Sequence, residues 1–228
     1  MKIPETGVWY YKATDTDELK YSMRSAIQNL GLKRIILVGD KPNWFVTSLN
    51  AIYVPSTLTR NDSFTRAWVP WQHMKNFVKS GVHDGEFLLF NDDFFILQPI
   101  TEWVDFHRDP NDYQERVAKK NRIYHAREIR ALLSLGKDPS KSYHYNMHIP
   151  MKMHTDQLKE TLIYWDNLLN KDVEFRTTYG NMHLRDTPEM IDVKYRPNEV
   201  FFSGGDRWWK MNGDDIRRLF PDKSFVER

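Results

Sequence analysis

The sequence predicts an α/β domain in which a mostly parallel central sheet is flanked by helices. Two observations predict this class. Short β-favouring runs alternate with helical patterns between residues 8 and 90, and the run at 34–38 is continuously apolar, as buried parallel strands are. The 228 residues suffice for one large core, so we expect a single domain over 1–228. The polar and basic stretch at 108–140 predicts a helical insertion.

The first elements form a predicted βαβ unit. A β-favouring run at 8–11 is followed by Asp15 and then by Glu18 three residues later, which is the spacing of a capping box. Apolar side chains then recur at helical spacing, and Gly31 supplies a stop for this helix. The apolar strand at 34–38 completes the unit.

The next elements continue the alternation of strand and helix. We expect strands at 51–54 and 86–90, and between them a helix over 71–78 that begins after Pro70. Strands that alternate with helices in this way favour a mostly parallel sheet.

The last third of the chain contains one clear helical pattern. Apolar residues at helical spacing predict an amphipathic helix over 155–169, with Thr155 or Asp156 as its N-cap. A short β-favouring run at 200–203 is expected to return to the sheet.

Composition excludes several classes of site and partner. The chain has no cysteine, which rules out disulfides, thiolate metal sites and cysteine nucleophiles, so any metal must use oxygen or imidazole ligands. The 33 basic and 31 acidic residues give a net charge of only +2, and no overall field demands a nucleic acid or a membrane. No stretch approaches the ~18 apolar residues of a membrane span, and we expect a cytoplasmic protein.

Polar residues follow three of the predicted strands. Lys12 comes after the first strand, Asp40 and Lys41 after the second, and the triplet at 91–93 after the strand at 86–90. In open α/β sheets, ligands bind outside the carboxyl ends of the strands, where loops and helix N-termini converge. These polar residues are therefore expected to meet at one rim, where they suit a metal-bound diphosphate.

The triplet Asn91-Asp92-Asp93 carries the most information. It interrupts an apolar segment, and two carboxylates are costly there unless a cation or hydrogen-bond donors satisfy them. Carboxylates at a strand end can hold Mg²⁺ or Mn²⁺ and leave coordination positions for water and donor phosphates. The alternative is an Asx turn that closes a hairpin between two apolar strands.

Three runs of the sequence resemble the Stealth family of nucleotide-sugar-dependent sugar-phosphate transferases in order and spacing. The runs are Asp17-Glu18-Leu19-Lys20-Tyr21-Ser22-Met23-Arg24-Ser25, Arg34-Ile35-Ile36-Leu37-Val38-Gly39-Asp40-Lys41-Pro42-Asn43-Trp44 and Phe87-Leu88-Leu89-Phe90-Asn91-Asp92-Asp93-Phe94-Phe95. His148-Ile149-Pro150 is similar to a later histidine-proline element of the family, and Arg176 to a downstream basic element. The resemblance implies a nucleotide-sugar donor and a fold similar to GT-A glycosyltransferases.

With this resemblance, the expected chemistry is transfer of a glycosyl group or a sugar phosphate to a hydroxyl of a polymer. The acceptor is either a polysaccharide or a modified base in DNA, which would have to be unstacked into a pocket. Two other functions remain open: a metal-dependent phosphohydrolase, because paired aspartates also support that chemistry, and a non-catalytic module that binds nucleotides or glycans.

Four residues are the candidates for catalysis and metal binding. Asp93 is the expected metal ligand, and Asp92 is a second ligand or the base for the acceptor hydroxyl, since adjacent strand residues point to opposite faces. His148 is the candidate acid or base, with His144 as the substitute. Arg176 is expected to stabilise charge on the phosphate, or alternatively to form a surface ion pair with an acidic neighbour, Glu174 or Asp172.

The candidates for donor binding come from the predicted rim and from the first helix. They are Lys12, Glu18, Arg24, Asp40, Lys41 and Asn91. Glu18 has a helix cap as its alternative role, and Arg24 a structural anchor. The basic stretch from Arg116 to Arg130, interleaved with Tyr113 and Tyr124, is interpreted either as a solvated helix face or as a surface that attracts a polyanion.

Overall fold

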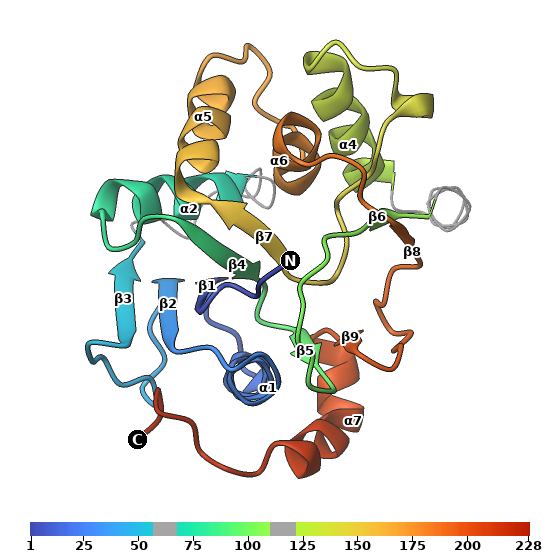
Figure 1. The fold of residues 1–228 in the computed structure, drawn as a ribbon. Helices are drawn as coiled ribbons and strands as arrows, with labels where there is room; N and C mark the ends of the chain where they lie inside the picture. Colours follow the sequence, from blue (N-terminus) through green and yellow to red (C-terminus); the bar gives the residue numbers. More distant parts are fainter. Residues whose placement is uncertain (57–67, 110–121) are drawn as a thin grey trace.

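A five-stranded sheet lies at the centre of the computed structural model, which describes residues 1–56, 68–109 and 122–228 (Figure 1). The strand order is β3-β2-β1-β4-β7. The strands are β1 (Thr6–Tyr11), β2 (Arg34–Gly39), β3 (Ala51–Pro55), β4 (Glu86–Phe90) and β7 (Met151–His154). β1 to β4 run parallel to one another and β7 is antiparallel to β4, so the predicted mostly parallel α/β sheet is confirmed.

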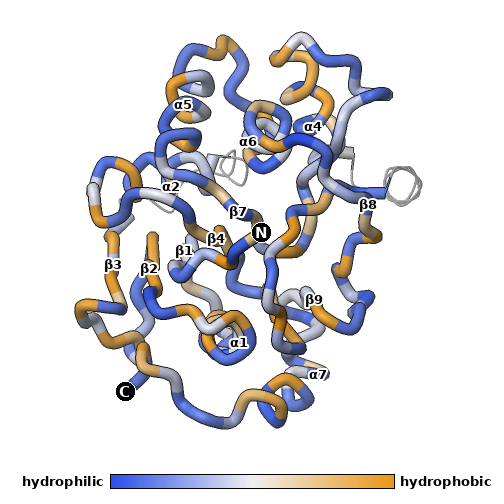
Figure 2. Tube along the Cα trace, in the orientation of Figure 1, coloured by the Kyte–Doolittle hydropathy of each residue, from blue (hydrophilic) through white to orange (hydrophobic). Residues whose placement is uncertain are grey.

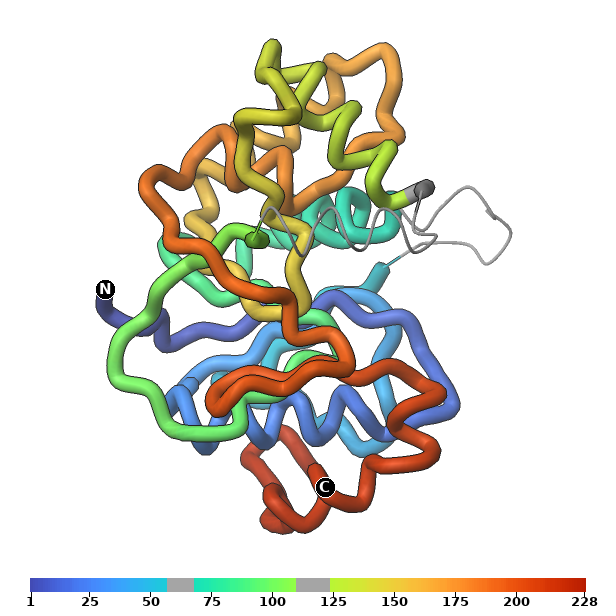
Figure 3. Tube along the Cα trace, turned by 90° about the vertical axis from the view of Figure 1, so that its right-hand side faces the viewer, coloured from blue at the N-terminus to red at the C-terminus, as the bar shows by residue number. Residues whose placement is uncertain are grey.

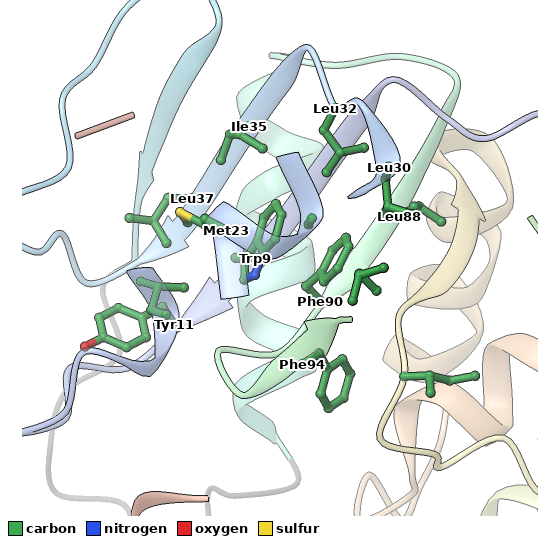
Figure 4. Packing of buried hydrophobic residues seen from close by; sticks show 14 of the residues in the cluster. Trp9, Tyr11, Met23, Leu30, Leu32, Ile35, Leu37, Leu88, Phe90 and Phe94 are labelled. Atoms are coloured by element: carbon green, nitrogen blue, oxygen red, sulfur yellow. The ribbon is translucent and has the colours of Figure 1, made fainter. Parts of the chain in front are cut away.

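The register of the sheet brings the carboxyl ends of its central strands side by side. Trp9 of β1 pairs with Leu37 of β2 on one side and with Phe90 of β4 on the other. The indole of Trp9 stacks on the Phe90 ring at 4.1 Å between centroids, as Figure 4 shows. The last residues of β1 and β4 therefore end at the same rim of the sheet.

Helices cover both faces of the sheet, and the strand residues divide between them. One cluster of buried residues, which includes Trp9 and Leu37, packs against α1 (Glu18–Leu30). The alternate residues Val8 and Ile36 belong to a second cluster, which contains residues of α2 (Trp68–Ser80), α5 (Thr155–Asp166) and α6 (Phe175–His183). Figure 2 shows the hydrophobic character of β2 and β3 between these layers.

The first helix ends as the sequence predicts but begins differently. Gly31 adopts a left-handed conformation with φ 65°, and its N–H donates to the Ile27 carbonyl at 3.1 Å, which is a glycine stop. The predicted capping box is wrong, because the N-cap is Asp17 and its side chain caps no backbone group. The Asp17 carboxylate instead accepts hydrogen bonds of 2.6 Å from Trp209 and Arg217.

Two small strand pairs lie beside the central sheet. β5 (Phe94–Ile96) pairs antiparallel with β9 (Phe201–Ser203), and β6 (His107–Arg108) pairs parallel with β8 (Glu189–Met190). The expectation that β9 returns to the central sheet is therefore wrong. The alternative in which β5 forms a hairpin with β4 is wrong as well. β9 leads into α7 (Asp206–Leu219), which packs against α1.

The remaining helices differ from expectation in their boundaries. Within the predicted insertion at 108–140, the structure contains α4 (Arg122–Ser134) and a 3₁₀ turn, η1 (Pro139–Lys141), and α4 packs on α6. Residues 110–121 lie outside the described part. The N-cap of α5 is His154, whose Nδ1 accepts from the Asp156 N–H at 3.2 Å, so the predicted N-caps, Thr155 and Asp156, are wrong.

The C-terminal tail is fastened to α1 by Arg24. Its guanidinium forms two hydrogen bonds to the Glu227 carboxylate, at 2.8 and 2.7 Å, and two more to the carbonyls of Phe220 and Pro221. The side chains of this ion pair are only 8% and 3% exposed. The sequence left open whether Arg24 contacts the nucleotide donor or anchors the structure. Its contacts make it a structural anchor, and its N–H groups are not directed to a nucleotide.

We expect Arg24→Met to destabilise the fold by about 3 kcal/mol, because the variant leaves the buried Glu227 carboxylate without its cation. Urea unfolding followed by tryptophan fluorescence measures the change. The double variant Arg24→Met/Glu227→Gln should lose less than the single variant. Lys33→Met breaks an exposed pair with Glu5 and should cost less than about 1 kcal/mol. Equal losses for the buried and exposed pairs would contradict the anchor role.

Candidate functional site at the carboxyl ends of β1 and β4

A cavity of about 1120 Å³ opens at the rim where β1 and β4 end. Its lining includes Tyr10, Lys12, Asn91, Asp92, His148 and Arg176. Five of the sequence-predicted site residues are therefore brought together at one cavity. Ligand pockets for a single small molecule measure roughly 300 to 1,000 Å³, so this one is large enough for a nucleotide and part of a second substrate.

Asn91 is held in place at the end of β4 by two neighbours. Its Oδ1 accepts a short hydrogen bond from the hydroxyl of Tyr10, and a second from Nη2 of Arg176 at 3.3 Å. Burial raises the pKa of the Tyr10 hydroxyl to about 12, so it remains a hydrogen-bond donor at neutral pH. The amide of Asn91 is therefore fixed toward β1 and α6.

The two aspartates of the triplet lie in different surroundings. Asp92 is half-buried and lines the cavity, whereas Asp93 is buried and does not. Oδ2 of Asp93 forms a close ion pair with Nζ of Lys194 and accepts from the Ser203 hydroxyl at 3.0 Å. Burial, followed by the nearby Asp93 charge, raises the pKa of Asp92 to about 7. Asp92, not Asp93, is thus the carboxyl group available to a ligand.

Glu18 lies near these aspartates, deep in the protein. Its side chain is 2% exposed; Oε2 accepts from the Thr16 hydroxyl at 3.3 Å, and Oε1 is buried with no partner among the described residues. Burial and the charges of Asp93 and Asp92 raise its pKa to about 8. Glu18 neither caps the helix nor lines the cavity. Together with Asp92 and Asp93 it forms a group of neighbouring carboxyl groups, the acidic cluster.

His148 is oriented by a buried carboxylate. Oδ2 of Asp192 lies 2.7 Å from the Nδ1 atom of the ring, and Oδ1 accepts from the backbone N–H of His148 at 2.9 Å. Asp192 is fully buried, and Arg108 donates to its Oδ2 at 3.0 Å. His148 lines the cavity and its side chain is 28% exposed, so the ring is accessible while one nitrogen is held.

His144, the substitute for His148, is placed differently. It is 6% exposed, and its Nδ1 lies 3.8 Å from a carboxylate oxygen of Glu128. Burial and the charge of Arg108 lower the pKa of His144 to about 4, so the ring is neutral at physiological pH. It does not line the cavity, and the histidine positioned for chemistry is His148.

Arg176 is buried at the floor of the cavity and does not form the alternative surface ion pair. Nη1 donates to the Ile149 carbonyl at 2.6 Å, and Nη2 to the Leu89 carbonyl at 3.3 Å as well as to Asn91. Glu174 instead caps α6 by accepting from the backbone N–H of Arg176 at 3.1 Å. The guanidinium therefore ties β4 to the segment before β7, and Arg176 belongs to the cavity lining.

Like Glu18 and Arg24, two further predicted donor-binding residues, Asp40 and Lys41, lie away from the cavity lining. Oδ2 of Asp40 accepts from the Ala13 N–H at 2.8 Å and so holds the loop that carries Lys12. Lys41 is exposed, with its ammonium 5.7 Å from the centre of the Tyr53 ring. Asp40 therefore shapes the rim indirectly, and the placement of Lys41 does not support its predicted nucleotide contact.

The described part of the basic stretch is largely compensated by acidic partners. Arg127 and Arg130 both pair with Asp172, at 2.6 and 2.5 Å. Tyr124 lines the cavity. The predicted residues Tyr113, Arg116, Lys119 and Lys120 lie outside the described residues. What the structure shows of this stretch favours a solvated helix face with one side on the cavity.

The sequence analysis missed Asp192 and Lys194, which contact His148 and Asp93. Asp192 stands between Ile191 and Val193, so an acidic side chain again interrupts an apolar run. This is the signal that singled out Asp92 and Asp93, applied to a shorter run. Lys194 has no comparable local signal, because an isolated lysine is usually a surface residue.

Glu128, a buried residue of the cavity wall, predicts a dependence of stability on pH. Burial raises its folded-state pKa to about 8, against 4.5 for the ordinary side chain. The folded chain therefore holds this proton after the unfolded chain has released it, and stability should fall as pH rises from about 4.5 to 8. We expect Glu128→Gln to flatten this decline in melting temperature, and Glu160→Gln, at an exposed position, to leave it unchanged.

Comparison of the chain with models of protein families and with curated proteins gives no match. The resemblance to the Stealth family therefore rests on the sequence runs themselves. Within the described ranges, no helix is both long and apolar enough to cross a membrane. The site is thus defined by its own geometry: a cavity at the carboxyl ends of parallel strands, with Asp92 and an oriented histidine in its lining.

Proposed function

We propose that this chain transfers a glycosyl group or a sugar phosphate from a nucleotide sugar to a hydroxyl of a polymeric acceptor, either a glycan or a modified base in DNA. One observation carries the proposal: Asp92 and His148 line the same cavity, and a buried carboxylate orients the histidine. A carboxyl group for the phosphate-bound cation and a base for the hydroxyl are the two groups that this reaction needs.

The arrangement of the sheet supports a nucleotide-sugar donor. The cavity lies outside the carboxyl ends of parallel strands, which is where open α/β sheets bind nucleotides. The edge strand β7 is antiparallel to β4, and Ile149 just before it is tied to the floor of the cavity by Arg176. This arrangement is compatible with a GT-A-like fold, and that assignment is part of the proposal.

The residues present fit a divalent cation, Mg²⁺ or Mn²⁺, that is shared with the donor. A cation beside Asp92 would relieve its repulsion by Asp93. No group of three or more acidic or histidine side chains among the described residues is arranged to enclose a metal. Mg²⁺ commonly takes one or two carboxylates, with water and substrate phosphates as its other ligands. When bound, the ion offsets charge on the leaving nucleotide.

His148 is the base in this proposal, and Asp192 positions it. Because Asp192 accepts the proton of Nδ1, the neutral ring has its lone pair on Nε2. Nε2 takes the proton of the acceptor hydroxyl as the hydroxyl oxygen bonds to the anomeric carbon, or to the phosphorus that carries the sugar. The bond from that atom to the nucleotide then breaks. Arg176, in the cavity lining, favours the developing negative charge.

The two other functions are less well supported by the site. Phosphohydrolases with two metals need several ligands around a pair of ions, and the described residues contain no such group. A non-catalytic module would have no use for a histidine held by a buried carboxylate. Product analysis separates them: a transferase places sugar on the acceptor, whereas a hydrolase releases free sugar or phosphate without an acceptor.

We expect Asp92→Asn to remove the part of nucleotide-sugar binding that depends on metal. Calorimetric titration of UDP-glucose, UDP-N-acetylglucosamine and GDP-mannose, with and without Mn²⁺, measures it. The loss should be at least about tenfold, the cost typical of removing even an outer-shell partner of a metal. Asp156→Asn, at an exposed salt bridge of α5, is the matched control. Binding that needs no metal and is unchanged in Asp92→Asn would sink the proposal.

We expect His148→Ala to reduce transfer by about 10²- to 10⁴-fold and to leave donor affinity unchanged, as for a group that acts in the transition state. Asp192→Asn should also slow transfer, because an Asn amide donates to Nδ1 and moves the ring proton to Nε2. Nitrogen NMR of the His148 ring detects this change of tautomer independently of activity. Full turnover in His148→Ala would remove the histidine from the mechanism.

A further inference from the structure

Three consecutive residues that follow Val193 contribute to the cavity. Lys194, Tyr195 and Arg196 all belong to its lining. In extended chain, successive side chains alternate between opposite faces, so three in a row cannot normally face one cavity. In Figure 3 this part of the chain belongs to the orange-red path that runs from β8 to β9, and an isolated bridge pairs Lys194 with Ser203.

The backbone of Tyr195 breaks the alternation. Its φ is 59°, in the left-handed region that side chains other than glycine rarely adopt. The N–H of Arg196 donates to the Val193 carbonyl at 3.1 Å, which closes a four-residue turn with Tyr195 in its third position. Turns of this kind usually place Gly or Asn there. A large aromatic residue thus occupies a position where Gly or Asn would be less strained.

The ring of Tyr195 is held from two sides and still exposed. Nζ of Lys194 lies 5.2 Å from the ring centre. The Tyr195 hydroxyl lies close to Gly205, so close that a Cβ atom on that residue would stand only 2.9 Å from it. Even so, the residue is 57% exposed. A strained backbone at a binding site, together with an exposed aromatic face in a cavity, indicates that the ring has a ligand and not a role in packing.

The residues around Tyr195 indicate which kind of ligand its ring contacts. Lys194, its neighbour in the chain, pairs with Asp93, and Asp192 three residues earlier holds His148. Tyr195 therefore lines the same cavity as Asp92 and His148, which in the proposed function act on the bond between sugar and phosphate. The part of the substrates nearest that bond is a sugar ring, whose C–H face packs on an aromatic side chain.

We propose that Tyr195 binds a sugar ring by stacking in the cavity. This inference rests on the proposed function and adds to it a residue that recognises the sugar. The stacked sugar ring belongs either to the nucleotide sugar or to the acceptor. Both present the same C–H face, and the two arms of the experiment distinguish them.

The experiment compares Tyr195→Phe, Tyr195→Ala and Tyr195→Gly with the wild type. Calorimetry measures the affinity for UDP-glucose, UDP-N-acetylglucosamine and GDP-mannose, and for UDP and GDP without a sugar. Transfer assays measure KM for maltoheptaose, chitohexaose and DNA that contains 5-hydroxymethylcytosine. Phe225→Ala, at an exposed aromatic residue in the C-terminal tail, is the matched control.

If the stacked sugar ring belongs to the donor, Tyr195→Ala should weaken nucleotide-sugar binding by about 3- to 10-fold and leave UDP and GDP binding unchanged. If it is the acceptor's, donor affinity should stay constant and the acceptor KM should rise by a similar factor. Tyr195→Phe should retain binding in either case. Tyr195→Gly should lose binding as Tyr195→Ala does, with a melting temperature that is unchanged or about 1 to 4 °C higher, because the backbone strain is relieved.

Two results would overturn the inference alone. One is a Tyr195→Ala variant that equals the wild type in nucleotide-sugar affinity and in acceptor KM. The other is a Tyr195→Gly variant that loses several degrees of melting temperature, which would assign the ring to packing. A wild-type chain that binds none of the nucleotide sugars would overturn the proposed function first, and the role of Tyr195 with it.

Discussion

Buried carboxylates need compensation, and this constraint organises the site. Asp192 and Asp93 each receive a cationic side chain and further hydrogen bonds, so they are stable inside the protein. Asp92 and Glu18 receive less, and their pKa values rise to about 7 and about 8. A ligand that brings positive charge is favoured where compensation is incomplete, and that place is the cavity lined by Asp92.

The central sheet supplies the rigid support for this arrangement. Parallel pairing of β1 with β4 places Tyr10 beside Asn91, and Arg176 joins the same group from α6. Segments from the end of the chain then complete the site: Ser203 of β9 and the turn around Tyr195 both approach the acidic cluster. The site is therefore shared between the first strands, which hold Asn91 and Asp92 in place, and the later segments, which provide Arg176 and Lys194.

Sequence reasoning succeeded where the signal is local. Gly31 ends α1 as predicted, and the apolar runs at 34–38 and 86–90 form parallel strands of the central sheet. It failed where a side chain has a distant partner. Asp17 has the residue type of an N-cap, yet Trp209 and Arg217 take its carboxylate, because hydrogen bonds from an indole and a guanidinium replace the capping bond. The sequence left the role of Arg24 open for the same reason, since its partners lie in the tail.

The sequence by itself determined the α/β class, the approximate positions of β1 to β4 and of α1, α2 and α5, and the acidic triplet at 91–93, because apolar periodicity and turn residues act within a few positions of the chain. Only the tertiary structure decided which aspartate faces the cavity and which histidine is oriented. Lys194 is 101 residues from Asp93, and Asp192 is 44 from His148. Charge compensation in a protein interior depends on distances in space, and folding alone brings such residues together.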